Sequence, residues 1–243
     1  MILYIVLAIL VTVGLVWLID KFIPSKFRPV IMLLLWVIIG FLAYNTFMSV
    51  YEPIQFNKVK NKRYAKVIES LIDIRDAQLA HRQVTGRFAG SFDNLIKFID
   101  TAEFTITQRR DSTVLDEEMT KRFGGVETTK EIVIIDTLGT VPVKDSLFGV
   151  DGRYKNIMNV PVGEPGAKFD MKAGFVEQND LKIPVFEASV KKSIILFDQD
   201  KNLVNQENQV VSVEGVNGDA IKVGSMDEVK TNGNWPKVYG SDD

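Results

Sequence analysis

Near its N-terminus the chain reads ILYIVLAILVTVGLVWLI at residues 2–19 and VIMLLLWVIIGFLAYNTFMSVY at residues 30–51. Neither run contains a charged side chain. A helix needs about 20 apolar residues to cross the hydrocarbon core of a bilayer, and both runs are close to that length. We therefore expect residues 1–52 to form a transmembrane hairpin, with spans at about 2–19 and 30–51, that anchors the protein in a lipid bilayer.

A cleaved signal peptide is the alternative explanation for residues 1–19. Such a peptide has basic residues ahead of its apolar run and small residues at the cleavage site. Here no Lys or Arg precedes Leu3, and the run ends in Trp17, Leu18 and Ile19. A retained anchor is therefore expected.

Basic residues give two opposing indications of topology. Lys21, Lys26 and Arg28 lie in the connection 20–29, directly beside the membrane, and favour a cytoplasmic loop with an external C-terminal domain. A second group lies after the second span and favours the reverse: Lys58, Lys60, Lys62, Arg63 and Lys66. Because the first helix usually sets topology, we expect a protein of the bacterial inner membrane with its C-terminal domain in the periplasm.

Residues 53–243 are expected to form a single extramembrane α+β domain. Pro53 predicts a break after the second span, because proline lacks the N–H that a continuing helix uses. Residues 57–84 then have the three- and four-residue apolar spacing of an amphipathic helix. The apolar face of that helix is predicted to consist of Tyr64, Val67, Ile68, Leu71, Ile72 and Leu79.

The following segment predicts a glycine-terminated helix and a second, shorter one. Gly86 is placed to end the long helix in a left-handed conformation. Ser91 is placed to cap a short helix over residues 91–101, whose apolar face contains Leu95 and Phe98.

Beyond residue 102 the apolar pattern becomes that of strands. Residues 109–130 interrupt it as a charged, exposed excursion or a hairpin tip with a turn of helix. The predicted strands lie at Phe104 and Ile106, 132–135, Val141 and Val143, 169–177, 184–190, 193–197, 210–213 and 220–223. The predicted fold class is membrane-anchored α+β: an N-terminal two-helix transmembrane hairpin, then a long amphipathic helix packed on an antiparallel β-sheet.

Composition excludes several functions. The 29 basic and 31 acidic residues leave no basic excess, so a nucleic-acid partner is not expected. Cysteine is absent and His81 is the only histidine, which excludes thiol chemistry and two-histidine metal sites. The glycines at Gly124 and Gly163 lack the context of a nucleotide-binding loop. We predict no catalytic, cofactor-binding or metal-binding residues, and therefore not an enzyme.

The best metal candidate is DQDKN at residues 198–202, which resembles the first half of a calcium loop. Leu203 stands at the sixth position, where the loop needs Gly, so a hairpin turn is the simpler interpretation.

Four other features are read as structural. Two pairs of carboxylates, Asp73 with Asp76 and Asp116 with Glu118, are read as solvated faces and loops. His81 is read as a surface or packing residue. The segment 225–228 matches a capping box and predicts a short helix, and Trp235 is expected to dock the tail 231–243.

Residues 67–99, VIESLIDIRDAQLAHRQVTGRFAGSFDNLIKFI, resemble the helix-and-turn segment of type II secretion pseudopilins and type IV pilins. Gly86, Phe88, Phe92 and Leu95 hold the matching positions. The resemblance implies a pilin-like fold held in the membrane as an accessory part of a secretion or surface-assembly machine. The two spans, the lack of a Glu near the start and the predicted break at Pro53 argue against incorporation into a filament.

These observations predict a non-enzymatic inner-membrane scaffold or accessory subunit of a cell-envelope complex. Its expected partners are other membrane or envelope proteins and the lipid bilayer, with a homo-oligomer as a further possibility. The two spans carry no ionisable residue, which argues against transport. The alternative is a membrane-anchored sensor or ligand-binding module.

Overall fold

The computed structural model describes residues 10, 12–14, 16–17, 21, 27–122, 124, 127 and 129–239. The chain divides into two compact units, Met1–Asn57 and Lys58–Asp243, which we call unit 1 and unit 2. Most of the predicted first span, residues 2–19, lies outside the described residues. The described residues within it are helical.

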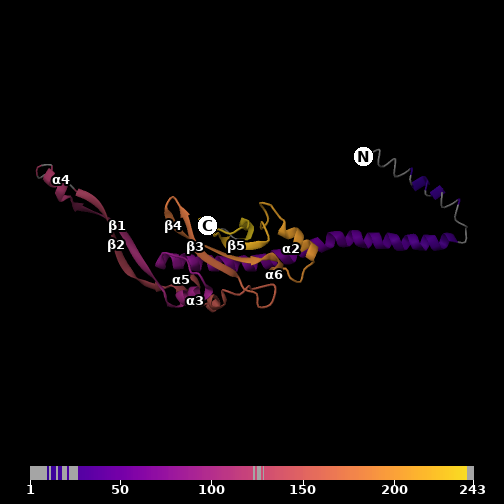
Figure 1. Ribbon diagram of the computed structural model, residues 1–243, viewed down its shortest axis with the longest axis horizontal. Coiled ribbons are helices and arrows are strands. Elements are labelled where there is room, and N and C mark those ends of the chain that lie inside the picture. Colours follow the sequence, from indigo (N-terminus) through magenta and orange to yellow (C-terminus); the bar gives the residue numbers. More distant parts are fainter. Residues whose placement is uncertain are drawn as a thin grey trace. The chain divides into compact units, whose positions relative to one another are not determined.

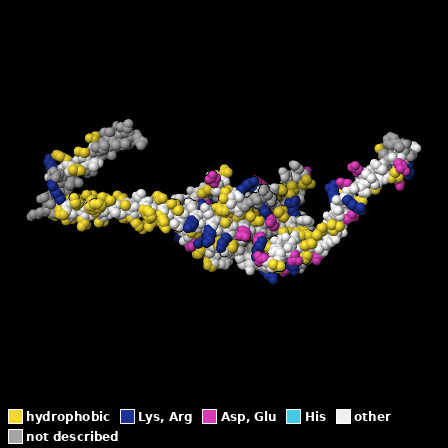
Figure 2. All heavy atoms as spheres, turned by 180° about the vertical axis from the view of Figure 1, so that it is seen from behind, with side chains coloured by type: hydrophobic (Ala, Val, Ile, Leu, Met, Phe, Trp, Pro, Cys, Tyr) yellow, Lys and Arg dark blue, Asp and Glu magenta, His cyan; other side chains and the backbone are white. Residues whose placement is uncertain are grey.

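Helix α2 runs from Arg28 to Thr85 and contains the second predicted span. It is the one helix of the described chain that is long and apolar enough to cross a membrane, and no residue of its apolar window is buried. Figure 2 shows hydrophobic side chains along this part of the helix. Among its exposed residues, Leu33, Trp36 and Phe41 present large apolar side chains.

The predicted break at Pro53 is wrong, because α2 continues through this residue. Proline removes one N–H donor and costs a helix interior about 3 kcal/mol. A helix that ended and restarted at Pro53 would instead leave several backbone N–H and C=O groups without their helical hydrogen-bond partners. The helix is also packed beyond the proline, where Tyr64 and Val67 are buried, so continuation is the less costly conformation.

In unit 2, α2 buries one face against a three-stranded antiparallel sheet (Figure 1). Tyr64, Val67, Ile68 and Leu71 are buried as predicted. Beyond Leu71 the prediction is wrong. Leu79 is exposed, and the buried face continues through Ile74, Ala77 and Gln78. Gln78 is polar but belongs to the core, since its side chain donates to the Ala89 carbonyl oxygen at 2.9 Å and accepts from the Ala89 N–H at 2.8 Å.

The sequence-predicted turn and short helix are confirmed. Gly86 has φ of +78°, and its N–H donates to the Arg82 carbonyl oxygen at the end of α2. Helix α3 spans Phe92–Thr101, and the Ser91 side chain accepts from the Asn94 N–H. Leu95, Phe98 and Ile99 are its buried residues.

The three-stranded sheet has the order β3–β4–β5, formed by Asp170–Gln178, Leu181–Lys191 and Ala220–Gly224. Asn179 and Asp180 join β3 to β4 with φ of 51° and 63°. Two successive positive φ angles define a type I′ turn, whose twist suits a two-residue hairpin. One face of this sheet packs toward α2 and supplies core residues such as Phe186. The α+β class is therefore confirmed for unit 2.

A separate two-stranded sheet is formed by β1, Glu103–Leu115, and β2, Thr129–Pro142. We call this hairpin the β-arm. Helix α4, Glu117–Arg122, follows β1 at the tip of the arm (Figure 1). The predicted charged excursion at 109–130 is therefore a hairpin tip with a turn of helix, but the strands extend farther into it than expected. Val143 begins helix α5, Val143–Leu147, instead of a strand.

Two other predicted strands are wrong. Residues 193–197 fall largely within helix α6, Lys192–Ile195, since a short apolar run fits either element. Residues 210–213 form no strand. They lie in a turn where the Asn217 side chain accepts from the Ser212 N–H, and Val211 and Val213 are almost fully exposed.

The segment after β5 is ordered by local hydrogen bonds and by one aromatic anchor. The Ser225 side chain accepts from the Asp227 and Glu228 N–H groups, but no helix follows, so the predicted helix at 225–228 is wrong. Trp235 is buried, which confirms a docked tail. The short helix η3, Lys237–Tyr239, follows it, and residues 240–243 lie outside the described residues. The other two elements are η2, Gly152–Asn156, and α7, Lys201–Asn208.

Candidate functional site

The β-arm is the first candidate site, because β2 places apolar side chains on both of its faces, half-buried at Ile132 and Ile134 and exposed at Val133 and Ile135. Opposite residues of an antiparallel pair share a face. Ile132 and Ile134 of β2 pair with Ser112 and Arg110 on one face, which we call face 1. Val133 and Ile135 pair with Asp111 and Arg109 on the other, face 2. Isolated two-stranded sheets are only marginally stable in water, so this pattern favours a further covering surface.

The two strands of the arm differ in composition. In β2, residues 132–135 are β-branched or aliphatic without interruption, and such residues suit strands. In β1, residues 107–112 are all polar or charged. The pairing register of the two strands shifts by one residue between Ile106 and Thr107, because Leu138 is an extra residue of β2. This extra residue is a β-bulge, and bulges increase the local twist of the strands.

The base of the arm is held by buried contacts. The Val143 N–H, just after β2, donates to the Ala102 carbonyl oxygen just before β1, at 3.0 Å. Val143 is fully buried, and helix α5 packs near α3. The base of the β-arm is therefore held to unit 2 by the Val143–Ala102 hydrogen bond and the buried Val143 side chain. The exposed part of the arm lies beyond these contacts.

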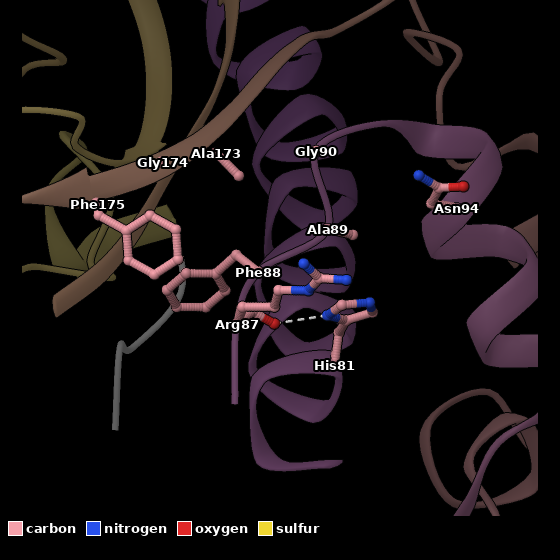
Figure 3. A pocket seen from close by; sticks show the side chains of 9 residues that line it. All are labelled: His81, Arg87, Phe88, Ala89, Gly90, Asn94, Ala173, Gly174 and Phe175. Atoms are coloured by element: carbon pink, nitrogen blue, oxygen red, sulfur yellow. Dashed lines mark hydrogen bonds between the residues drawn. The ribbon is translucent and has the colours of Figure 1, made fainter. Parts of the chain in front are cut away.

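A cavity of about 480 Å³ is the second candidate site. It lies between the end of α2, the turn at 86–90, the start of α3 and the middle of β3 (Figure 3). Its lining includes the rings of Phe88 and Phe175 together with Ala173 and Gly174 of β3. Its polar side chains are His81, Arg87 and Asn94, with no carboxylate among the lining residues.

His81 is fixed beside this cavity by the turn. Its Nδ1 lies 2.6 Å from the Arg87 carbonyl oxygen. A carbonyl oxygen only accepts, so Nδ1 is the donor in this contact. The ring also packs edge-on against Phe98. The predicted packing role is thus observed, and the side chain additionally lines a cavity.

A buried ionic cluster connects α2, α6 and α7. The Lys192 ammonium is fully buried and donates to the backbone carbonyl oxygens of Glu207 and Val216, at 2.7 Å each. The Glu207 carboxylate lies 3.4 Å from Lys192 and 2.9 Å from Lys60. Burial lowers the pKa of Lys192, while it raises the pKa of Tyr64, whose hydroxyl approaches the same carboxylate. No sequence pattern indicated this cluster.

The predicted turn at 198–202 is not a hairpin turn, because α7 begins at Lys201. Asp200 caps this helix by accepting from the Asn202 and Leu203 N–H groups. Asp198 instead accepts two hydrogen bonds from Arg63, at 2.6 and 2.8 Å, which hold its pKa well below the ordinary value. No group of three acidic or histidine residues able to hold a metal occurs in the described chain.

The two carboxylate pairs are separately engaged. Asp73 accepts two hydrogen bonds from Arg153, yet burial raises its pKa. Asp76 pairs with Arg75. Asp116 accepts from the Met119 N–H at the start of α4. Ion pairing and helix capping therefore account for these acidic residues.

Comparisons with protein-family models, curated proteins and solved structures find no match to this chain.

Proposed function

We propose that this protein is a non-enzymatic, membrane-anchored scaffold or accessory subunit of a cell-envelope complex, and that it contacts its partners through the β-arm. The observation that carries this proposal is the exposure of apolar residues on the arm: Ile106, Leu115, Val133, Ile135 and Leu138. Several large apolar side chains exposed on one projecting element favour a protein interaction site. The apolar part of α2 supplies the anchor.

Burial and charge support an extracytoplasmic position for unit 2. Of the basic residues that favour the opposite topology, Lys60 pairs with Glu207 and Arg63 pairs with Asp198. These two charges therefore have a structural role within the domain. The connection with Lys21, Lys26 and Arg28 remains as the charge group beside the membrane, and it favours a cytoplasmic loop. We accordingly propose a bacterial inner-membrane protein with unit 2 in the periplasm.

Reporter fusions test this topology. A periplasm-dependent reporter placed after Asp243 should be active, and the same reporter within residues 20–29 should be inactive. The reverse pattern would overturn the proposed location. If both fusions were active in the periplasm, the hairpin would be wrong as well.

The pilin resemblance also remains a proposal. The order of a long helix, a glycine turn, a short helix and an antiparallel sheet supports it. Because α2 continues through Pro53, one of the three departures that argued against filament incorporation is removed. A membrane-embedded accessory role in a secretion or surface-assembly machine is the form of the proposal that we keep.

Co-purification tests the scaffold function. The full chain is extracted with mild detergent, and its associated proteins are compared with those of Ile135→Lys, which places a charge on face 2 of the arm. Val211→Lys, in an exposed turn outside the arm, is the matched control. We expect Ile135→Lys to lose the envelope partners and the control to keep them. Isolation of the wild-type protein with no partner, or equal recovery from all three, would refute the proposal.

The cavity beside His81 favours a second candidate, a ligand-binding module. Arg87 and Asn94 provide donors, Phe88 and Phe175 provide apolar walls, and no acidic residue lines the space. An anionic ligand with an apolar portion suits this chemistry, such as a peptide with a free terminal carboxylate. A saturable rise in melting temperature with such peptides, lost in Arg87→Gln and kept in Arg109→Gln, would support this function. No shift with peptides, sugars or calcium would exclude it for these ligands.

A further inference from the structure

We propose that two copies of this chain join edge to edge through β2, forming a four-stranded antiparallel sheet with the order β1–β2–β2–β1. This inference rests on the proposed role of the β-arm as a contact surface, and it names the partner as a second copy. The argument depends on three properties of the arm: an open strand edge, an uneven distribution of charge and a self-complementary register.

The outer edge of β2 is open. Strand β2 pairs with β1 alone in the described residues, so every second residue along its other edge directs its N–H and C=O away from the arm. Unpaired edges recruit further strands, and natural proteins block them with charges, proline or short length. Residues 132–135 of β2 contain no charge and no proline. The centre of this edge therefore lacks the usual protection, and charged residues stand only on either side of it.

The centre of β1 carries charges, whereas the centre of β2 carries none. The central residues of β1, 107–112, are polar or charged and include Arg109, Arg110 and Asp111. A second copy that approached β1 symmetrically around Arg110 would place two guanidinium groups opposite each other, and like charges in that position are destabilising. The difference between the edges directs pairing to β2.

A two-fold axis through Val133 gives β2 a self-complementary register. Residues whose numbers sum to 266 then lie opposite each other, because the strands run antiparallel. Ile132 faces Ile134, Lys130 faces Asp136 and Glu131 faces Ile135, each twice, while Val133 faces Val133 on the axis. Even-numbered residues remain on face 1, so the two sheets continue without a change of face.

Neighbouring symmetric registers lose the Lys130–Asp136 pair. An axis through Ile132 places Lys130 opposite Ile134, and an axis through Ile134 places Asp136 opposite Ile132. An axis through Glu131 places two carboxylates opposite each other. Only the Val133 register among these pairs charged residues with opposite charges. Asp136 already accepts from Arg110 at 2.9 Å on face 1, so Lys130 of the second copy would complete a row of alternating charge.

Because the chain contains no cysteine, single cysteine variants test this register directly. Val133→Cys places the same residue on both sides of the axis, within reach of a disulfide. Ile135→Cys is the matched control on the same face. Its two copies would lie four residues apart along the strand, which is about 14 Å, so they are too distant to join. The side chains of Val133 and Ile135 are 45% and 66% exposed. Solvent exposure alone would therefore favour oxidation of the control, Ile135→Cys.

The variants are made in the full-length protein, oxidised mildly in membranes and analysed by non-reducing electrophoresis. Most Val133→Cys protein should become a covalent dimer, at least five-fold above Ile135→Cys. A mixture of Glu131→Cys and Ile135→Cys should cross-link although neither does so alone, because these residues face each other across the axis. Circular dichroism confirms that each variant is folded.

Equal cross-linking of Val133→Cys and Ile135→Cys would overturn the proposed register, and no cross-linking of Val133→Cys would overturn the pairing itself. These outcomes are separate from the fate of the scaffold function. If Ile135→Lys loses envelope partners while Val133→Cys stays monomeric, the arm binds another protein and the present inference is wrong. If the dimer forms but no envelope partner co-purifies, the inference holds and the scaffold function is wrong.

Discussion

Replacement of Glu207 by glutamine should strongly destabilise unit 2, although it preserves the shape of the side chain. The Glu207 carboxylate contacts the fully buried Lys192 ammonium at 3.4 Å. Removing one partner of a buried ion pair costs about 3–5 kcal/mol, because the other charge stays buried without compensation. The amide would also direct an N–H donor toward Lys60 or Lys192, which are themselves donors.

Urea unfolding of the full chain in a non-denaturing detergent measures this loss. Trp235 is buried and reports on unit 2 when Trp17 and Trp36 are replaced by phenylalanine. With a urea dependence of about 2 kcal/mol per molar, the predicted loss lowers the unfolding midpoint by about 1.5–2.5 M. Glu187→Gln is the matched control. Its partner Lys222 is partly exposed, so its loss should stay below about 1 kcal/mol.

A double replacement isolates the coupling between the two charges. Lys192→Met alone leaves the carbonyl oxygens of Glu207 and Val216 without their donor, which costs about 1–3 kcal/mol for a buried group. In Lys192→Met/Glu207→Gln the fully buried cation is gone and only the partly exposed Lys60 loses its contact with the carboxylate, so the double variant should lose at least about 1 kcal/mol less than the sum of the single variants. Additive losses, or a loss below about 1 kcal/mol in Glu207→Gln, would refute the description of this cluster.

The pH dependence of stability provides a further check on Lys192. Its pKa in the folded protein is lowered by burial. Between that value and its ordinary value of about 10.4, the unfolded chain binds more protons than the folded one, so stability should rise with pH across this window. The rise should be absent in Lys192→Met.

Three further experiments test separate parts of the structure. Leu71→Ala should lower the unfolding free energy by about 2–5 kcal/mol by opening a cavity, whereas Leu79→Ala, on the exposed side of α2, should lower it by less than about 1 kcal/mol; equal losses would contradict the observed buried face. Asp198→Asn should be slightly less stable than wild type at neutral pH. The charged form of Asp198 is favoured in the folded state, so its contribution is present above pH ~4 and is lost as the pH falls toward its lowered pKa; a difference unchanged by acid would be inconsistent with the Arg63 pair. Asp180→Gly should raise the melting temperature and Asp180→Val should lower it by the equivalent of roughly 1–2 kcal/mol, because Asp180 has φ of 63° in the β3–β4 turn; the opposite order would exclude the type I′ turn.

Local patterns in the sequence predicted the elements whose signals are themselves local. The glycine turn at Gly86, the cap at Ser91, and the strands β3, β4 and β5 each follow from a few neighbouring residues. Where two elements share a local pattern, the prediction failed. The apolar run at 193–197 suits a strand or a helix, and only its packing in unit 2 makes it the end of α6.

The candidate sites were less accessible to sequence reasoning. The cavity beside His81 is lined by residues from α2, the following turn, α3 and β3, and β3 is separated from the others by more than 70 positions. The β-arm was indicated only in part, as short strands on either side of a charged excursion or hairpin tip at 109–130. Its charges at 109–111 are adjacent in sequence, but its apolar character comes from β2, and the pairing of the two strands brings both to one surface.

By itself, the sequence determined that the chain contains apolar runs of membrane-spanning length, that an amphipathic helix follows them and that no thiol chemistry is available. Length, hydropathy and composition are properties of consecutive residues and need no knowledge of contacts. Only the tertiary structure decided that Lys192 is buried, that Asp198 binds Arg63 and that β2 has one open edge. These properties depend on residues far apart in the chain, such as Lys60 and Glu207, which are separated by 147 positions and meet only when the domain folds.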